Sequence, residues 1–554
     1  MKISNILLTP NELTLEKLSF CENSVKSMQE WVNTLNLLHL GSTAKALFKA
    51  VIEIAELKCP ETLRFDLIQV IHPIIENILK NIEKQYFNQS LISSDRNDQI
   101  IELSLLLRTQ FAKVYIEIAQ ISHQHLIEKK AIWPYQKSKK NLQTARVLGS
   151  YYALQQLGLL LYQQQILYST PRPGQWLITH QLMNHAIEHH YSLTRINYIQ
   201  GTQYQLKNIT QVYAQLILLD IFNNNQIRPS ELQGLYLCTF KWASLVQITA
   251  KETTTSRYIV DTTKDLAPIY NSHQEKNFKA NVFISTQNLL AYLSNNERFN
   301  KENLSENERK FLSPALHFHI HNILTTNAER RHERYEYSTK IKICFGLNVA
   351  HYYLANGKDL AETLNQLNGS TAPNNKIPSK DARKVYQVDV LDISVNGYRI
   401  KWINETPKNL KTGEFILVQE NTQSPWRGGV IRWIKQVNKT LEMGLEILAQ
   451  DIAPCSVHLN NKTVPHYYSA LLMQTTQLDE SSTQLAIAGV NIFEEKQIIS
   501  LHLTHHELQI YLVKPTLITK SFICYEFELL NEYQRPLLNT YIRKQLEEMK
   551  NQNL

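Results

Sequence analysis

The sequence Arg330-Arg331-His332-Glu333-Arg334 lies where the apolar periodicity of this chain changes. Before it, apolar residues recur about every 3.6 positions, which is the spacing of one face of an α-helix. After it, apolar and polar residues alternate, as they do on a β-strand with one buried face. The junction therefore predicts an α+β chain, with a helical first half and a strand-rich second half.

The glycine distribution supports the same division. Six of the 15 glycines lie before residue 328, and nine lie in the shorter remainder. Glycine is common in turns and unfavourable inside helices, so turns should be sparse early and frequent late. Helices followed by sheet would produce this distribution.

Length and composition indicate a globular chain of several domains. Its 554 residues exceed the size of one hydrophobic core, so we expect about two to four domains. Hydrophobic residues make up 43% of the chain, which is ordinary for globular proteins and is enough to form buried cores. The six cysteines are far apart and form no C-x-x-C pair, so neither a zinc module nor a disulfide framework is expected.

The charge pattern argues against a nucleic-acid partner or a polybasic membrane tail. The formal net charge is only +8, and the basic residues are scattered along the chain. A mild positive excess would instead suit a small anionic ligand. The N-terminus lacks a signal-peptide pattern, and no apolar run reaches the roughly 18 residues that cross a bilayer. We expect a cytoplasmic protein with no transmembrane segment.

Residues 1–250 are expected to form an all-α domain. Apolar stripes such as those within residues 63–78 and 103–118 have helical spacing, and short polar connectors suggest antiparallel helices. The helices would form a bundle or an irregular α-solenoid, and we favour the bundle because no fixed repeat emerges. Residues 251–327 read as a partly helical connecting segment with a short extended piece at 257–261.

Residues 328–452 have the pattern of a β-barrel, because several short alternating runs are separated by turn signals. Residues 355–384 interrupt this rhythm with glycine, asparagine and proline, and read as an inserted loop. Residues 453–554 continue as a second strand-rich region that would suit a second small barrel. A closing helix over residues 536–549 has one apolar face.

Three blocks of sequence in the barrel region carry a resemblance to a known family. Residues 330–334 form an R-x-x-x-R motif, and residues 392–397, Asp-Ile-Ser-Val-Asn-Gly, form a D-x-S-x-x-G motif. The third block consists of residues 429–433 followed by residues 443–448. With these blocks in this order, the chain resembles the PilZ-domain cyclic di-GMP receptor family over about residues 329–450.

The resemblance implies a cyclic di-GMP site on the outside of the barrel. This ligand is a dianion with two guanines, so it suits arginine, which grips phosphate or a guanine edge at two points and stacks on a purine. An aspartate accepts hydrogen bonds from guanine N1 and N2, and a serine two residues on lies at the same strand face. A glycine at the turn permits positive φ and close backbone approach. The implied ligand-binding residues are Arg330, Arg331, Arg334, Asp392, Ser394 and Gly397, with Arg399 as an additional contact.

Each motif can also be explained without a ligand. A basic run is common at a helix end, where it complements the helix dipole, and D-x-S-x-x-G suits an ordinary strand-to-turn junction. The occurrence of both motifs in order favours nucleotide binding. One feature departs from the family pattern, because the insertion at 355–384 makes the separation between Arg334 and Asp392 longer than usual.

We therefore expect a receptor that couples cyclic di-GMP binding at the barrel to the helical half, without a cofactor. The helical half would dock an unidentified protein partner, such as pilus, flagellar or exopolysaccharide machinery, and so regulate motility, surface attachment or biofilm formation. The alternative is a ligand-free scaffold whose degenerate barrel serves protein–protein interaction. The sequence contains no G-x-S-x-G, H-E-x-x-H or Gly-rich dinucleotide motif, so we do not expect an enzyme.

His185 and His189 stand four residues apart, a spacing that places two metal ligands on one helix face. The sequence offers no acidic third ligand, because the nearby Glu188 points elsewhere on the helix. A polar helix face explains the pair better, so we expect no metal site.

Overall fold

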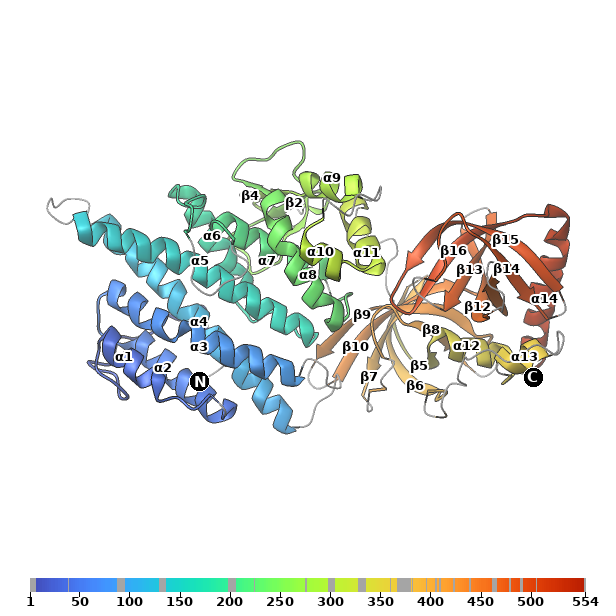
Figure 1. Cartoon of the computed structure of the whole chain (residues 1–554), viewed down its shortest axis with the longest axis horizontal. Coiled ribbons are helices and arrows are strands. Elements are labelled where there is room, and N and C mark those ends of the chain that lie inside the picture. The colour runs from blue at the N-terminus through green and yellow to red at the C-terminus, as the bar shows by residue number, and fades with distance from the viewer. Residues whose placement is uncertain are drawn as a thin grey trace. The chain divides into compact units, whose positions relative to one another are not determined.

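Figure 1 shows the fold of the chain in a computed structural model. The structure describes residues 6–37, 39–86, 95–128, 136–197, 206–223, 225–274, 277–296, 304–326, 335–358, 360–365, 380, 382–394, 396–403, 406–407, 410–421, 424–437, 440–460, 466–477, 480–488, 492–504 and 506–552. The chain divides into two compact units. The second consists of residues 225–228, 313–322 and 329–554, and the first contains the rest.

The first unit contains the expected all-α region, drawn from blue to green in Figure 1. Its first eight helices are α1 (Val25–Asn33), α2 (Leu40–Glu56), α3 (Glu61–Tyr86), α4 (Asp95–Glu128), α5 (Gln136–Ile166), α6 (Gln175–Glu188), α7 (Ile209–Asn223) and α8 (Pro229–Trp242). Helix α5 contacts α3, α4, α6, α7 and α8, whereas a helix in a solenoid contacts only its neighbours. The helices therefore form a bundle around α5. Within the described residues, no helix is both long and apolar enough to cross a bilayer.

The segment expected to be a partly helical connector contains a small antiparallel sheet. Its strands are β1 (Gln247–Thr249), β2 (Tyr258–Val260), β3 (Ile269–Tyr270) and β4 (Val282–Ser285), in the order β1-β4-β2-β3. Helices α9 (Gln287–Asn296), α10 (Glu306–Phe311) and α11 (Pro314–Thr325) follow. The extended piece at 257–261 corresponds to β2, but the sheet itself was missed because strands of two to four residues are too short to show a period.

The second unit contains two closed six-stranded barrels, which confirms the predicted barrel and shows that the further β region is also a barrel. The first consists of β5 (Tyr335–Phe345), β6 (Tyr386–Ser394), β7 (Gly397–Trp402), β8 (Phe415–Gln419), β9 (Arg427–Val437) and β10 (Thr440–Ala449), in the order β10-β7-β6-β5-β8-β9. The second consists of β11 (Asp451–Leu459), β12 (Tyr468–Gln477), β13 (Glu480–Ala488), β14 (Ile498–Leu503), β15 (His506–Ile518) and β16 (Phe522–Leu529), in the order β11-β12-β13-β16-β15-β14.

The predicted closing helix is present as α14 (Arg535–Gln552). Its apolar face, which includes Leu538 and Ile542, is buried in the core of the second barrel. The sequence pattern therefore identified both the helix and the face that it buries. This helix packs on the core of the second barrel and covers apolar residues that the strands alone would leave exposed to water.

The insertion between β5 and β6 is partly helical, which corrects the expectation of a loop over residues 355–384. Helix α12 (Leu347–Leu354) precedes that range, and α13 (Leu360–Asn365) lies inside it. Leu347 and Leu354 of α12 are buried in a core that also contains residues of both barrels, such as Phe415 and Phe522. Residues 366–379 of the expected loop lie outside the described residues.

An aromatic pair within this shared core joins residues of the two barrels. The rings of Phe415 in β8 and Phe522 in β16 meet edge to face, with centroids 5.2 Å apart and planes at 88°. Both side chains are fully buried. Edge-to-face geometry adds to the hydrophobic contribution of two such rings, so this pair helps to join the two barrels into one unit.

Phe522→Ala should destabilise the second unit by about 3–5 kcal/mol, because it leaves a cavity in the shared core. Thermal and urea unfolding, followed by tryptophan fluorescence and circular dichroism, would measure the loss. Tyr533→Ala is the matched control, since the Tyr533 side chain is 96% exposed and its removal should leave stability nearly unchanged. Equal stability of the two variants would contradict a core role for Phe522.

Candidate functional site

The strand that carries Asp392 contains a β-bulge immediately before this residue. Val388 and Val390 of β6 are buried barrel residues, and simple alternation would place Asp392 on the same face. The register with β7 shifts between Val390 and Asp392, so that Val390 pairs with Ile400 and Asp392 with Arg399. Bulges re-aim side chains in this way, and Asp392 consequently faces the Arg399 side chain.

Arg399 is held by two carboxylates from neighbouring strands. Its Nη1 donates to Asp392 Oδ2 at 3.2 Å, and its Nη2 and Nε donate to Glu442 Oε2 at 2.7 and 3.1 Å. The hydrogen bond to Glu442 has the largest influence on the Arg399 guanidinium and raises its pKa, so the group stays charged. Asp392 and Glu442 thus share one fixed cation, and Glu442 is a member of the site that sequence reasoning missed.

The turn after Asp392 is closed by Ser394 and Gly397. These two residues pair across the β6–β7 hairpin, and Ser394 Oγ lies 3.4 Å from the Gly397 carbonyl oxygen to which it donates. Gly397 begins β7 and is not among the residues with positive φ, so that part of the expectation was wrong. Its other expected property is present, since a Cβ there would lie 2.3 Å from the Leu445 carbonyl oxygen. Glycine is needed because β10 approaches closely.

The arginine motif precedes a strand that pairs with β6. Arg330, Arg331 and Arg334 lie outside the described residues, so their positions stay a prediction. The next residue in the chain, Tyr335, begins β5 and pairs with Ile393, while Glu336 pairs with Asp392. The start of β5 is therefore held beside the end of β6 that carries Asp392 and Ser394.

Comparison with known proteins gives the family. One family model, "Cyclic-di-GMP receptor FimW, N-terminal domain", matches residues 26–253. A second, "Cyclic-di-GMP receptor FimW, middle PilZ domain", matches residues 257–384 and 369–454. The chain belongs to the PilZ-domain cyclic di-GMP receptor family.

A curated relative supports this membership across most of the chain. The protein "Cyclic-di-GMP receptor FimW" of Pseudomonas aeruginosa is 23% identical over 577 aligned positions, which cover 93% of this chain and 92% of the relative. No solved structure matches the chain. The middle PilZ model begins at residue 257, well before the arginine motif, and ends at residue 454. Almost all of the second barrel therefore lies beyond both family models.

The third block of the family resemblance has a structural explanation in the PilZ barrel. Gly444 of β10 pairs with Trp433 of β9. A Cβ on Gly444 would lie 2.0 Å from the indole Nε1 of Trp433, so the ring lies directly over the glycine. An aromatic ring over a strand glycine covers backbone that would otherwise lack a side chain to pack against it. This block therefore supports the barrel wall.

A second charged cluster on the PilZ barrel was also missed from the sequence. Tyr398 donates its hydroxyl to Glu420 Oε1 at 2.6 Å, and Arg427 forms an ion pair with the same carboxylate at 2.5 Å. The Arg427 guanidinium lies 5.5 Å from the centre of the Tyr398 ring. Tyr398 follows the D-x-S-x-x-G turn, but Arg427 lies on β9 and Glu420 directly follows β8. No local sequence pattern therefore predicts the cluster.

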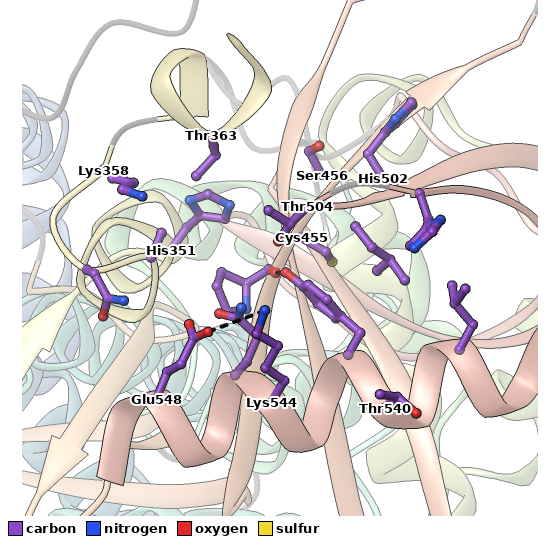
Figure 2. A pocket seen from close by; sticks show the side chains of 18 of the residues that line it. His351, Lys358, Thr363, Cys455, Ser456, His502, Thr504, Thr540, Lys544 and Glu548 are labelled. Atoms are coloured by element: carbon purple, nitrogen blue, oxygen red, sulfur yellow. Dashed lines mark hydrogen bonds and ion pairs between the residues drawn. The ribbon is translucent and has the colours of Figure 1, made fainter. Parts of the chain in front are cut away.

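The described part of the insertion lines a cavity with the second barrel. Figure 2 shows this cavity, which has a volume of about 560 Å³. His351 of α12 and Thr363 of α13 line it from the segment between β5 and β6. Ser456 and His502 line it from the second barrel, and Lys544 from α14. Helices α12 and α13 therefore face the second barrel and α14.

Gly397→Ala should destabilise the PilZ barrel by about 1–3 kcal/mol, because the added methyl would overlap the β10 backbone. Gly41→Ala is the control. A Cβ at Gly41 meets nothing within 4 Å, and alanine is favoured over glycine in a helix such as α2. Urea unfolding should place the midpoint of Gly397→Ala below wild type and that of Gly41→Ala at or above it. A wild-type midpoint for Gly397→Ala would disprove the close approach.

Proposed function

We propose that this PilZ-family chain binds cyclic di-GMP where the start of β5 meets the β6–β7 hairpin. The observation that carries the proposal is the pairing of Tyr335 with Ile393. It ties the residue that follows Arg334 to the strand that carries Asp392 and Ser394. The two motifs are separated by an insertion in the sequence. The pairing nevertheless places the start of β5, which follows the arginine motif, beside the end of β6, which carries the second motif.

The chemistry of the motifs suits this ligand. Arg330, Arg331 and Arg334 would supply planar cations for the two phosphates and for guanine edges or faces. Asp392 and Ser394 would supply polar contacts to a guanine. Gly397 would act through the backbone, since it holds the hairpin against β10.

Arg399 is assigned a positioning role in this proposal. It touches Asp392 and is anchored by Glu442, so it holds the Asp392 carboxylate in one orientation before a ligand arrives. A preorganised acceptor loses less conformational entropy on binding. The fixed cation also offsets the repulsion that a bare carboxylate would exert on a dianionic ligand.

The output is proposed to pass through the helical half. Binding at the start of β5 would act on the segment that precedes it in the chain, and hence on the helical unit. That unit would dock a protein partner in the cytoplasm, with pilus, flagellar or exopolysaccharide machinery as the candidate classes and motility, attachment or biofilm formation as the behaviour controlled. The proposed role is binding and signal transfer, not catalysis.

A ligand-free scaffold is the alternative function. It is favoured by the second barrel, which lies beyond the family models, and by the packing of the insertion on that barrel. In this case the PilZ barrel would serve as a rigid surface for another protein. The two functions differ in whether Arg334 and Asp392 matter for a ligand.

Wild-type protein should bind cyclic di-GMP in calorimetric titration, and Arg334→Ala should weaken binding at least about tenfold. The reason is the loss of a charge-assisted contact worth about 1.5–3 kcal/mol. Asp392→Ala should weaken binding in the same direction. Arg543→Ala, on an exposed position of α14, removes the same charge elsewhere and should leave affinity unchanged. A folded protein that gives no heat at tens of micromolar ligand would favour the scaffold.

Cyclic di-GMP should also protect the arginine motif from trypsin, which cleaves after arginine and lysine. Ligand contact would slow cleavage after Arg330, Arg331 and Arg334, as measured by mass spectrometry of timed digests. Cleavage after Arg195, an exposed residue of the first unit, provides an internal reference that should not change. In Asp392→Ala, protection should require a higher ligand concentration, because this variant binds more weakly. Unchanged cleavage at the motif under saturating ligand would contradict the assignment of these arginines.

A further inference from the structure

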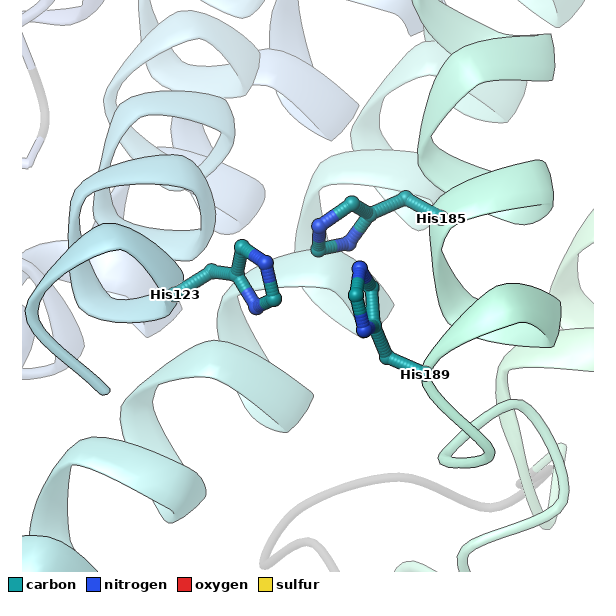
Figure 3. Close-up of side chains that lie close together, drawn as sticks. All are labelled: His123, His185 and His189. Carbon is teal, nitrogen blue, oxygen red and sulfur yellow. The ribbon is translucent and has the colours of Figure 1, made fainter. Parts of the chain in front are cut away.

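Three histidine side chains meet between helices α4 and α6 in the first unit. Figure 3 shows His123 of α4 facing His185 of α6 and His189, which caps the end of α6. One ring nitrogen of each lies within 4.8 Å of the others. His185 and His189 are one helical turn apart, as the sequence indicated. The third ligand that the sequence could not supply is His123, which lies on a different helix.

Two of the three ring pairs lie closer together than ordinary aromatic packing requires, and the third lies at the short end of the ordinary range. The His123 centroid is 4.0 Å from that of His185 and 4.3 Å from that of His189, and the latter two are 4.5 Å apart. Packed aromatic pairs usually have centroids about 4.5–7 Å apart. Their planes are also inclined at 47° to 87° to one another, so the three rings do not form a stack.

Neighbouring groups orient the His185 ring. Its Nδ1 lies 2.8 Å from the Tyr191 hydroxyl, which in turn lies 3.3 Å from Ser150 Oγ. This contact leaves Nε2 of His185 for another partner. Metal-binding histidines characteristically use their second nitrogen in this way.

We propose that His123, His185 and His189 bind one divalent transition-metal ion of the class that prefers imidazole, such as Zn²⁺. In a tetrahedral site with Zn–N distances of about 2.0–2.1 Å, the ligand nitrogens are about 3.4 Å apart. Because the ligand nitrogens lie within 4.8 Å of one another, the three side chains need to close by at most about 1.4 Å. His189 is exposed and the other two are half-buried, which leaves a route for the ion and room for this adjustment.

The fourth ligand is expected to be a small anion or hydroxide. The Arg146 guanidinium lies 4.3 Å from the centre of the Tyr191 ring and 3.4 Å from His123 Nδ1. A fixed positive charge at the edge of the site disfavours a bare divalent ion. It favours an ion whose charge is reduced by an anionic fourth ligand. Three protein ligands with an open fourth position are typical of zinc sites that bind water or a small ligand.

A second group of potential ligands, on the second barrel, has a simpler explanation. His458, His502 and Glu507 also lie within 4.8 Å of one another. However, His458 Nδ1 is 2.8 Å from His502 Nε2, so a hydrogen bond between the two imidazoles accounts for their closeness. We propose no metal site at this group. Its histidines could still bind added Zn²⁺, so His458 is substituted before the metal bound at the His123, His185 and His189 cluster is measured.

The test uses the full-length chain in a His458→Gln background, stripped with a chelator and desalted. Titration with Zn²⁺ should then show one ion per chain and raise the melting temperature, because the ion binds the folded state. Co²⁺ should give the visible absorption bands of a tetrahedral complex. His189→Gln, at an exposed position, should weaken Zn²⁺ binding by more than about tenfold and abolish the Co²⁺ bands.

The matched control is His190→Asn. His190 is the exposed neighbour of His189 and has φ of 56°, a conformation that asparagine tolerates. This variant should keep wild-type metal affinity and the Co²⁺ spectrum. The proposal is overturned if the His458→Gln protein shows no saturable binding at micromolar Zn²⁺, or if His189→Gln binds as tightly as His190→Asn.

Discussion

The double pairing of β5 is the interaction on which the candidate site and the second unit depend. This strand pairs with β6 on one side and with β8 on the other, and so closes the PilZ barrel. Its first residue is the neighbour of Arg334, and its last, Phe345, leads through Gly346 into α12. Ile341 and Ile343 are buried in the barrel, so hydrophobic burial fixes the register. That register places both ends of β5.

The two barrels are joined by apolar and by polar contacts. Around the shared core, Arg228 donates to the Thr412 carbonyl oxygen at 2.6 Å and to Ser521 Oγ at 2.7 Å, and it lies 3.6 Å from Glu414 Oε2. Ser521 donates to the same carboxylate. The cation is thus satisfied by a backbone carbonyl, a hydroxyl and a carboxylate, as a half-buried charge requires. Residues 225–228 consequently belong with the barrels, although they lie between helices in the chain.

In both the candidate site and the histidine cluster, a neighbouring side chain orients a functional group. Glu442 anchors Arg399, which contacts Asp392, and Tyr191 contacts His185. In both cases the neighbour lies on another strand or beyond the end of the helix. Second contacts of this kind reduce the freedom of the first, and they bind two parts of the fold together wherever they occur.

The sequence by itself determined the change from helices to strands, the closing helix and the family motifs. These depend on local periodicity and on short patterns that one chain segment contains alone. Only the tertiary structure decided the four-stranded sheet, the packing of α12 on the second barrel, the role of Glu442 and the meeting of His123 with His185. Strands of two to four residues carry too few side chains to show a period. The other contacts join residues far apart in the chain, and such proximity is set by the packing of whole elements, which no local pattern records.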